Sequence, residues 1–390
     1  MSIKIAYVAH YEVDNLGAGN GTDYFKLESL RHSEFEIIPV YPLKIEADFS
    51  TKLRRKFNEK ILKKWHPLDL DASVLKSYAK QLERNPLVQT ADAIVCPTFH
   101  TVCFLKIDKP IIYWTDATFN NLLDLYPDYK KISSYCVRSG HLAQQKALNN
   151  ARFAVYSSLW AAKSAANDYG AQLENLRVIP FGINFQSNRT HQEIKEIIDE
   201  RTRQECKLFF LGFDSERKGV DVAIEVTKRL KDLGVPAHLT IAGSSPKIPK
   251  DATEFVTVLG RVNKLKGGSD LLERLFKQSH FFILPSRADC TPMVIAEAFS
   301  FGCPALSTSV GGIPSMIEND INGYHLPVGY SPDTYAEKIL TLWKNFNRYH
   351  QMCLNSFKSF QTTFNWEVAG SNMRSLIKEV VHESQELKRP

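Results

Sequence analysis

The sequence predicts an α/β protein of two domains, each built around a parallel β-sheet. With 390 residues, the chain is too long for one ordinary hydrophobic core and fits two cores of moderate size. Short apolar runs recur along the chain between helix-length segments, and several are apolar throughout, as in Phe281–Leu284. Strands buried on both faces have this composition, and their alternation with helices favours parallel sheets covered on both sides.

The apolar runs give the expected order of the strands. In the first half we expect strands at residues 5–9, 36–40, 93–96, 111–114, 153–157 and 178–181. In the second half we expect them at residues 208–213, 238–242, 256–260, 281–284 and 305–308. The expected domains are therefore residues 1–182 and 206–365, joined by a polar linker at 183–205.

Composition is that of a soluble globular protein, with 44% hydrophobic and 24% charged residues. The net charge of +6 does not by itself indicate a nucleic-acid partner, and none is expected. No window reaches the ~18 apolar residues that a membrane span requires, and the apolar start of the chain indicates a buried strand rather than a signal peptide. The seven cysteines are odd in number, widely spaced and without a C-x-x-C pair, which favours reduced thiols in the cytoplasm over a zinc site.

The clearest motif follows the expected strand at 281–284, where a loop leads into a helix. Thr291 and Pro292 are a good N-cap and first helical residue, so the helix should begin there. The first free amides, those of Met293 and Val294, would then point at the carboxyl end of the sheet. Together with the helix dipole, they would form a phosphate site.

Two carboxylates flank this helix start. Asp289 lies just before it, Glu297 lies in its second turn, and such groups accept hydrogen bonds from sugar hydroxyls. The alternative is that Thr291 only caps a helix and Asp289 is a solvated acid in a loop.

A second motif follows the expected strand at 208–213. Arg217 and Lys218 precede Gly219 and a helix that should begin near Val220. Adjacent cations at a strand end can neutralise a diphosphate, and glycine permits a tight entry into the helix. The alternative is a pair of exposed cations in a surface loop.

A third motif is a glycine loop after the first strand, with Gly17, Gly19 and Gly21. Its G-x-G-x-G spacing differs from the dinucleotide motif, and no acidic residue ends the second strand, so we reject a dinucleotide site. Three glycines nevertheless let the backbone approach a ligand closely.

In their order along the chain, these motifs resemble those of family 4 glycosyltransferases, which have the GT-B fold. Seven residues lie between Asp289 and Glu297, as between the two acids of that family. The other matching segments are Arg217-Lys218-Gly219, Gly260-Arg261-Val262, Pro285-Ser286, Gly302-x-Pro304, Gly311-Gly312-Ile313-Pro314, Val178-Ile179-Pro180-Phe181-Gly182 and Phe364-Asn365-Trp366-Glu367. The resemblance is good over residues 150–370 and loose in the N-terminal half. It implies two Rossmann-like domains whose parallel sheets face a central cleft, with a last helix, 366–390, that crosses back to the N-terminal domain.

The resemblance also implies roles for individual residues. Glu297 would bind the donor ribose and Asp289 the transferred sugar, while Arg217 and Lys218 would hold the diphosphate. The remaining donor contacts would come from Thr291, Pro292, Met293, Val294, Arg261, Val262, Gly19 and Gly21. Such enzymes are similar in retaining anomeric configuration and in needing no essential metal or other cofactor.

Three departures from the family pattern bear on these roles. The first acid is Asp289 where glutamate is usual, and the usual Gly-Arg after the strand is Gly212-Phe213, for which Arg217 would substitute. Many members have a histidine near the acceptor, where this chain has Asp116, which we expect to contact sugar or accept a proton. Each change could instead mark an inactive relative.

Residues 51–65 allow two interpretations. Seven cations flank an apolar stripe of Leu53, Phe57, Ile61 and Trp65, a pattern that suits an interfacial helix on an anionic membrane. Alternatively, a surface helix packs this stripe on the N-terminal sheet and keeps its lysines in solvent. The following Asp69-Leu70-Asp71 does not follow a strand, so we interpret it as a cap or turn rather than a metal motif.

We therefore expect a retaining, metal-independent hexosyltransferase that acts on a nucleotide-diphosphate sugar, with UDP or GDP as the nucleotide. The acceptor would be a hydroxyl of a glycan, a lipid-linked glycan or a small molecule, in polysaccharide or glycolipid biosynthesis. A sugar-nucleotide epimerase, a phosphorylase and a non-catalytic sugar-nucleotide-binding relative are the alternatives. The expected location is the cytoplasm, either free or at the inner face of the membrane through residues 51–65.

Overall fold

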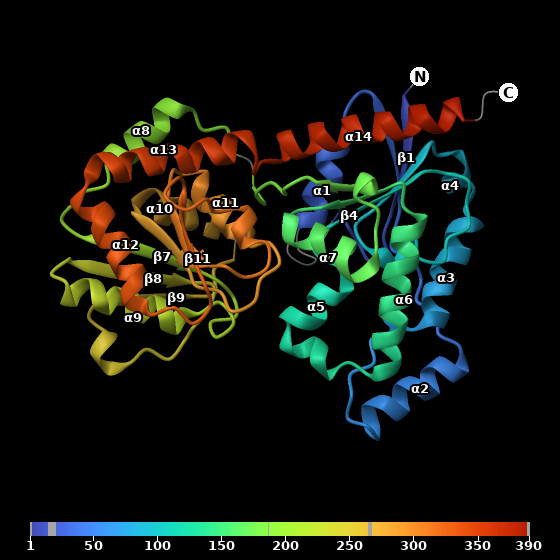
Figure 1. The fold of residues 1–390 in the computed structure, drawn as a ribbon, viewed down its shortest axis with the longest axis horizontal. Coiled ribbons are helices and arrows are strands. Elements are labelled where there is room, and N and C mark those ends of the chain that lie inside the picture. The colour runs from blue at the N-terminus through green and yellow to red at the C-terminus, as the bar shows by residue number, and fades with distance from the viewer. Residues whose placement is uncertain (1, 15–20, 186, 264–266, 388–390) are drawn as a thin grey trace. The chain divides into compact units, whose positions relative to one another are not determined.

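The chain folds as two compact α/β units. The computed structural model describes residues 2–14, 21–185, 187–263 and 267–387. The first unit comprises Met1–Gly182 and Trp366–Pro390, and the second comprises Ile183–Asn365 (Figure 1). The expected glycine-loop residues Gly17 and Gly19 lie outside the described residues, whereas Gly21 lies within them.

The first unit is built on a parallel sheet with the strand order β2-β1-β3-β4-β5-β6. Its strands are β1 (Ile3–Val8), β2 (Phe35–Val40), β3 (Ala93–Cys96), β4 (Ile111–Thr115), β5 (Phe153–Tyr156) and β6 (Leu176–Val178). Its α-helices are α1 (Thr22–Leu30), α2 (Phe49–Lys60), α3 (Ala72–Glu83), α4 (Pro86–Thr90), α5 (Phe119–Leu125), α6 (Ser134–Asn150), α7 (Leu159–Tyr169) and α14 (Trp366–Glu386). Side chains of α3, α6 and α7 share one apolar core with alternate residues of the strands, while α14 packs on α1 and β3 (Figure 1).

The second unit repeats this plan with the strand order β12-β11-β10-β7-β8-β9, again parallel throughout. Its strands are β7 (Cys206–Leu211), β8 (Ala237–Ala242), β9 (Val256–Gly260), β10 (Phe281–Leu284), β11 (Ala305–Thr308) and β12 (Gly323–Leu326). Its α-helices are α8 (His191–Asp199), α9 (Val220–Asp232), α10 (Ser269–Gln278), α11 (Met293–Phe299), α12 (Pro332–Lys344) and α13 (Phe346–Thr362). α9 packs against α12, whereas α13 packs against α8 and α11 (Figure 1).

The expected two-sheet α/β architecture is confirmed, and each expected strand overlaps an observed one. β6 ends at Val178 rather than continuing to Phe181, since Pro180 has no N–H with which to extend the ladder. The edge strand β12 was not expected, because its sequence Gly-Tyr-His-Leu is short and lacks a run of β-branched residues.

The segment 183–205, which we expected to be a linker, contains α8 as part of the second unit. Ile194, Ile197 and Ile198 form its buried stripe, and Thr190 caps its start in a capping box with Glu193. Three buried isoleucines in nine residues are enough to fix a short helix on its neighbours.

Two residues beyond α8, the Arg201 guanidinium is buried at 4% exposure without a carboxylate partner among the described residues. It donates to the carbonyl oxygens of Lys277 (3.0 Å), Gly302 (2.8 Å) and Phe301 (2.8 Å), and to the Tyr349 hydroxyl (3.2 Å). The side chain thus ties the ends of α10 and α11 to α13.

The helix α2 corrects one of the two interpretations of residues 51–65. Its buried residues are the polar Thr51 and Asn58, whereas the apolar Leu53 and Phe57 are exposed to solvent. The interpretation in which the stripe packs on the N-terminal sheet is therefore wrong. Among the described residues, no helix is long and apolar enough to cross a bilayer.

The role of Arg201 can be tested by replacing it with methionine, which keeps its length but removes all five N–H donors. Three carbonyl groups then lose a charged partner, and we expect the second unit to lose about 3 kcal/mol of unfolding free energy. Urea denaturation measures this loss. Arg203→Met, an exposed arginine two residues away, is the control and should cost less than ~1 kcal/mol. Equal losses in the two variants would contradict the role assigned to Arg201.

Candidate functional site

The strand order of the second unit reverses between β7 and β10. From β7 the chain moves outward through β8 and β9, then returns to place β10 on the other side of β7. In open parallel sheets, ligands bind beyond the carboxyl ends of the strands at such a reversal. The loops after β7 and β10 are therefore the first places to look for a site.

These two loops are joined by an ion pair between side chains that are both about nine-tenths buried. Lys218, at the end of the β7 loop, donates its ammonium to the Asp289 carboxylate in the β10 loop. Lys218 and Asp289 belong to two separate sequence motifs, and the structure brings them together. A buried ion pair of this kind keeps each of its two charges compensated.

Backbone contacts hold the same two loops in register. The Arg217 guanidinium donates to the Ala288 carbonyl at 2.7 Å. The backbone N–H of Arg287 donates to the Arg217 carbonyl, also at 2.7 Å. Arg287 also forms a bidentate pair with Asp221 at 2.9 and 2.6 Å, and this pairing lowers the pKa of Asp221. Arg217 is thus largely occupied with loop structure, and neither Arg287 nor Asp221 was identified from the sequence.

Two glycines allow backbone to pass backbone at this edge of the sheet. Gly219 has φ 75° and begins α9, where an added Cβ would overlap the Pro285 carbonyl. Gly311, with φ 56°, lies against the Asp289 carbonyl in the same way, and the Gly312 N–H donates to the Cys290 carbonyl at 2.7 Å. Any side chain at either position would push the two loops apart.

The start of α11 corrects the expected cap by one residue. The N-cap is Pro292, and the helix begins at Met293, so Thr291 lies one residue before the N-cap. The first backbone bond runs from Ile295 N–H to the Pro292 carbonyl at 3.0 Å, so the Met293 and Val294 amides remain at the open end as expected.

Glu297 lies on this seven-residue helix and is 2% exposed. A carboxylate so far from water is usually retained for a specific partner, because burying its charge costs several kcal/mol. The Lys218–Asp289 pair thus lies in the loops beyond the carboxyl ends of β7 and β10, and the buried Glu297 lies on the helix that follows the β10 loop.

Arg261 and Val262 follow β9, two strands from β7 in the sheet. The Arg261 guanidinium lies 5.8 Å from the ring of Phe213, which follows β7 and is 71% exposed. An exposed aromatic ring beside a cation at the open edge of a sheet offers a stacking surface for a planar group.

The first unit has its own polar cluster beyond the carboxyl ends of β1 and β4. Gly21, with φ 75°, begins α1, and Lys26 on this helix donates to Asp23 (2.8 Å) and to the Trp114 carbonyl (3.1 Å). Tyr11 donates to Asp23 at 2.5 Å. Burial, then Asp23, and to a lesser degree Asp116 raise the pKa of Tyr11, so Asp116 belongs to this neighbourhood.

A histidine pair next to this cluster was not identified from the sequence. The His10 and His100 rings lie 4.6 Å apart, and His10 Nε2 lies 3.7 Å from an Asp69 oxygen. Burial works to raise the pKa of Asp69, but the bond from His10 and the nearby His100 outweigh burial and lower it. His10 lies two residues after β1, His100 follows β3 and Asp69 comes from a distant turn, so no local spacing signals the group.

The Asp69-Leu70-Asp71 segment confirms the cap interpretation for its second acid. Asp71 is the N-cap of α3 and accepts from the Ser73 N–H at 3.0 Å. No group of three or more His, Cys, Asp or Glu side chains in the described parts of the chain is arranged to hold a metal ion.

Two histidines should stay neutral at a pH where an ordinary imidazole is charged. Burial, with a smaller effect of His10, lowers the pKa of His100 to about 3, and burial with Arg201 lowers that of His280 to about 3. His280 Nδ1 also accepts the Lys207 N–H at 3.0 Å, which only a neutral ring can do.

At pH 5 we therefore expect both imidazoles to be neutral by nitrogen NMR of histidine-labelled protein, with His100→Gln and His280→Gln assigning the signals. Unfolded protein in urea, where both side chains should titrate near 6.5, is the control. Both histidines have a lower pKa in the folded protein than in the unfolded chain. Their titration therefore does not reduce the free energy of unfolding above pH 6.5, and reduces it progressively as the pH falls from 6.5 toward 3. A protonated ring at either position at pH 5 would contradict its assignment.

Solved structures with similar folds are glycosyltransferases. Sucrose-phosphate synthase from Thermosynechococcus elongatus superposes with a TM-score of 0.66 at 13% identity, covering 98% of this chain and 100% of that one. Anabaena HepE, solved in complex with UDP, superposes with a TM-score of 0.63 at 15% identity, covering 97% and 100%. At these identities the likeness concerns the fold, which is GT-B.

Sequence relatives match over a shorter region. The amylovoran biosynthesis glycosyltransferase AmsK of Erwinia amylovora is 24% identical over 233 residues, which cover 57% of this chain and 55% of that protein. The chain spans about half the length of the curated relatives it matches. Residues 192–358 match the family model described as Glycosyl transferases group 1. The second unit, with the Lys218–Asp289 pair and Glu297, therefore carries a glycosyl transferases group 1 domain.

Proposed function

We propose that this protein transfers a sugar from a nucleotide-diphosphate donor to an acceptor hydroxyl, and that the donor binds at the carboxyl edge of the second unit. The observation that carries the proposal is the buried Lys218–Asp289 pair at the reversal of strand order, with the buried Glu297 on the helix that follows the same loop. A cation beside two carboxylates suits a ligand that has a diphosphate at one point and hydroxyl groups on either side. The group 1 domain supports the same assignment.

Glycosyl transfer breaks the bond between the anomeric carbon and the donor phosphate. The electron pair of that bond goes to the diphosphate, so negative charge develops there in the transition state. Lys218 and the Met293 and Val294 amides would stabilise this charge, and the Arg217 guanidinium would hold the loop that presents Lys218. The cation supplies this stabilisation without a bound metal, so we propose a metal-independent reaction.

Donor binding requires Lys218 to exchange partners. Its ammonium is bound to Asp289, and a diphosphate would compete for it. Once released, the Asp289 carboxylate could accept hydrogen bonds from the hydroxyls of the transferred sugar. Glu297 would bind the ribose hydroxyls, and the Phe213 ring with Arg261 would lie near the base.

The acceptor would bind at the carboxyl edge of the first unit. Asp116, Tyr11 and the His10–Asp69 pair supply carboxylate, phenol and imidazole groups there. Asp116 is the acid we propose to contact the acceptor or accept its proton. For the donor we favour UDP or GDP, and the structural neighbour HepE has been solved with UDP.

The donor site is tested by thermal unfolding in the presence of UDP, GDP or ADP, with and without magnesium. A nucleotide at ~100 times its Kd should stabilise the second unit by about 2.7 kcal/mol, since it binds only the folded state. We expect one nucleotide to do so with or without magnesium, and Glu297→Ala to abolish the effect. The exposed Glu337→Ala on α12 is the control and should respond as the wild type. A nucleotide response that survives in Glu297→Ala would contradict the assigned site.

The exchange of partners predicts opposite effects of the two members of the ion pair. Lys218→Gln should weaken UDP binding at least ~10-fold, because a charged hydrogen bond to phosphate is lost. Asp289→Asn frees the lysine, so UDP should bind as tightly as to the wild type or more tightly, while sugar transfer falls at least ~10-fold. Calorimetry measures binding, and proton NMR follows release of sugar from UDP-glucose and other donors and reads the anomeric configuration, which we expect to be retained.

The result that would overturn the exchange is equal loss of UDP affinity in both variants. Thermal unfolding without nucleotide checks that each variant is folded, since breaking a buried pair can itself cost ~3 kcal/mol.

A further inference from the structure

The helix α2 and the turn after it form a surface that is both apolar and basic, defined here as the α2 surface, residues 49–65. Six large apolar side chains in it are between 46% and 82% exposed: Phe49, Leu53, Phe57, Ile61, Leu62 and Trp65. Elsewhere in the described chain, exposed large apolar side chains are scattered, mostly singly. Burying this stripe against something would be favourable, and a contiguous patch of this kind marks an interaction site.

The exposure of the stripe is fixed by the other face of α2. Thr51 Oγ1 lies 2.5 Å from Ser73 Oγ, and the Arg54 guanidinium donates to Asp71 at 2.5 Å. Asn58 lies 3.2 Å from His66 Nδ1, and His66 Nε2 lies 3.1 Å from the fully buried Asp71. Rotating the helix to bury its stripe would break this network and take the Arg54 guanidinium away from the fully buried Asp71 carboxylate, which is costly.

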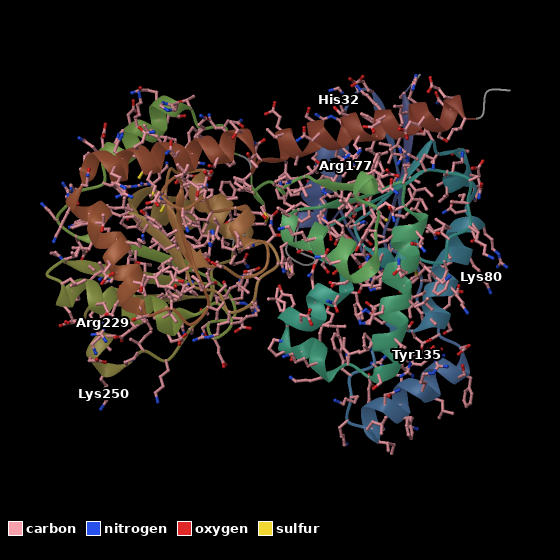
Figure 2. All side chains as sticks on the ribbon, in the orientation of Figure 1. His32, Lys80, Tyr135, Arg177, Arg229 and Lys250 are labelled. Atoms are coloured by element: carbon pink, nitrogen blue, oxygen red, sulfur yellow. The ribbon has the colours of Figure 1, made fainter. Side chains whose placement is uncertain are left out.

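The contact between Arg54 and α6 adds to this anchoring. The Arg54 guanidinium stacks 4.2 Å from the ring centre of Tyr135, which Figure 2 labels on α6 beside α2. The polar face of α2 therefore attaches the helix to the rest of the first unit, and the apolar face is free to contact a partner.

Five exposed lysines accompany the apolar stripe. Lys52, Lys56 and Lys60 recur every fourth residue, each directly before Leu53, Phe57 or Ile61, so they form a second stripe parallel to the apolar one. Lys63 and Lys64 follow in the turn. None of the five pairs with an acid within the described residues. A pocket of about 540 Å³ opens between Lys52, Arg55, Lys56 and Lys60 and the segment around Glu46.

Trp65 extends the surface toward a neighbouring turn. Its backbone N–H donates to the Lys131 carbonyl at 2.9 Å, and its backbone carbonyl accepts from the Ser133 N–H at 2.8 Å. The indole ring packs edge-on against the Tyr129 ring, with 6.1 Å between the ring centres. Trp65 is nonetheless 46% exposed. Tryptophan and tyrosine beside lysines are the residues that favour the boundary between lipid tails and headgroups.

We propose that the α2 surface docks the first unit on an anionic lipid bilayer. The helix would lie in the plane of the membrane, with Leu53, Phe57 and Ile61 below the headgroups and the lysine stripe at the lipid phosphates. Two adjacent stripes, one apolar and one cationic, are complementary to a surface that is apolar below and anionic above. A protein partner fits less well, because its interface would have to bury lysines that pair with nothing on this chain, and lysine is depleted in such interfaces.

Vesicle flotation tests the proposal directly, since it measures binding and does not depend on any catalytic activity. We expect the full chain to float with vesicles that contain phosphatidylglycerol, not with pure phosphatidylcholine vesicles, and to be released by salt. Reversing three lysines (Lys52→Glu, Lys56→Glu, Lys60→Glu) should lower partitioning at least ~100-fold. Removing the apolar stripe (Leu53→Ser, Phe57→Ser, Ile61→Ser) should lower it to a similar extent, because each side chain no longer inserts.

Matched controls carry the same chemical changes on other exposed positions of the first unit. Lys80→Glu, Lys106→Glu and Lys163→Glu give the same change in net charge, and Leu87→Ser, Leu142→Ser and Leu173→Ser the same loss of apolar area; Lys80 is labelled in Figure 2. Both control triples should bind within ~3-fold of the wild type. All substituted side chains are exposed, so thermal unfolding should be unchanged.

Three results would overturn the proposal. The first is equal binding to anionic and neutral vesicles, or to neither, and the second is wild-type binding by the lysine variant. The third is a wild-type dimer in solution that Leu53→Ser, Phe57→Ser and Ile61→Ser convert to a monomer, which would make the α2 surface a contact between copies of this chain.

Discussion

The candidate donor site depends on two places where one backbone passes another with no room for a Cβ atom. Gly219 lies against the Pro285 carbonyl and Gly311 against the Asp289 carbonyl. Both have positive φ, which only glycine adopts without strain. Because the loops after β7, β10 and β11 approach this closely, Lys218 and Asp289 come within bonding distance although 70 residues separate them. The chemistry of the site thus rests on backbone geometry before it rests on any charged side chain.

The buried ion pair has a physical consequence for any ligand of this edge. Two charges that compensate each other in a poorly solvated place are already desolvated, so an anionic ligand does not have to strip water from the lysine. It has only to replace one carboxylate partner with another anion. This exchange favours ligands that also offer hydrogen-bond donors to Asp289, and a sugar diphosphate has both groups in one molecule. A free phosphate would leave the carboxylate uncompensated, so the pair discriminates against it.

The sequence predicts those features that depend on residues close together along the chain, and misses those that join distant residues. Local patterns of apolar residues and glycine indicate buried strands such as Phe281–Leu284 and the start of a helix at Val220, and both elements were predicted. Other contacts join residues that are far apart in the chain, so no local spacing predicts them. They are the ion pair of Arg287 with Asp221, the contact of His10 with His100, and the bonds from Arg201 to backbone carbonyl groups. Lys218 and Asp289 were each selected by motif, but only the strand order could bring them together.

The α2 helix shows why an amphipathic pattern does not by itself determine which face is buried. Its apolar stripe could pack on the sheet or face outward, and the choice is made by Asp71, which draws Arg54 and His66 inward. Asp71 directly follows the short turn Leu68–Leu70, and an oxygen of Asp69 within this turn lies 3.7 Å from His10 Nε2 at the carboxyl edge of the sheet. One turn therefore connects the α2 surface to the polar edge of the first unit. A displacement of α2 would pull on Asp71, and Asp69, two residues away along the chain, carries the contact to His10.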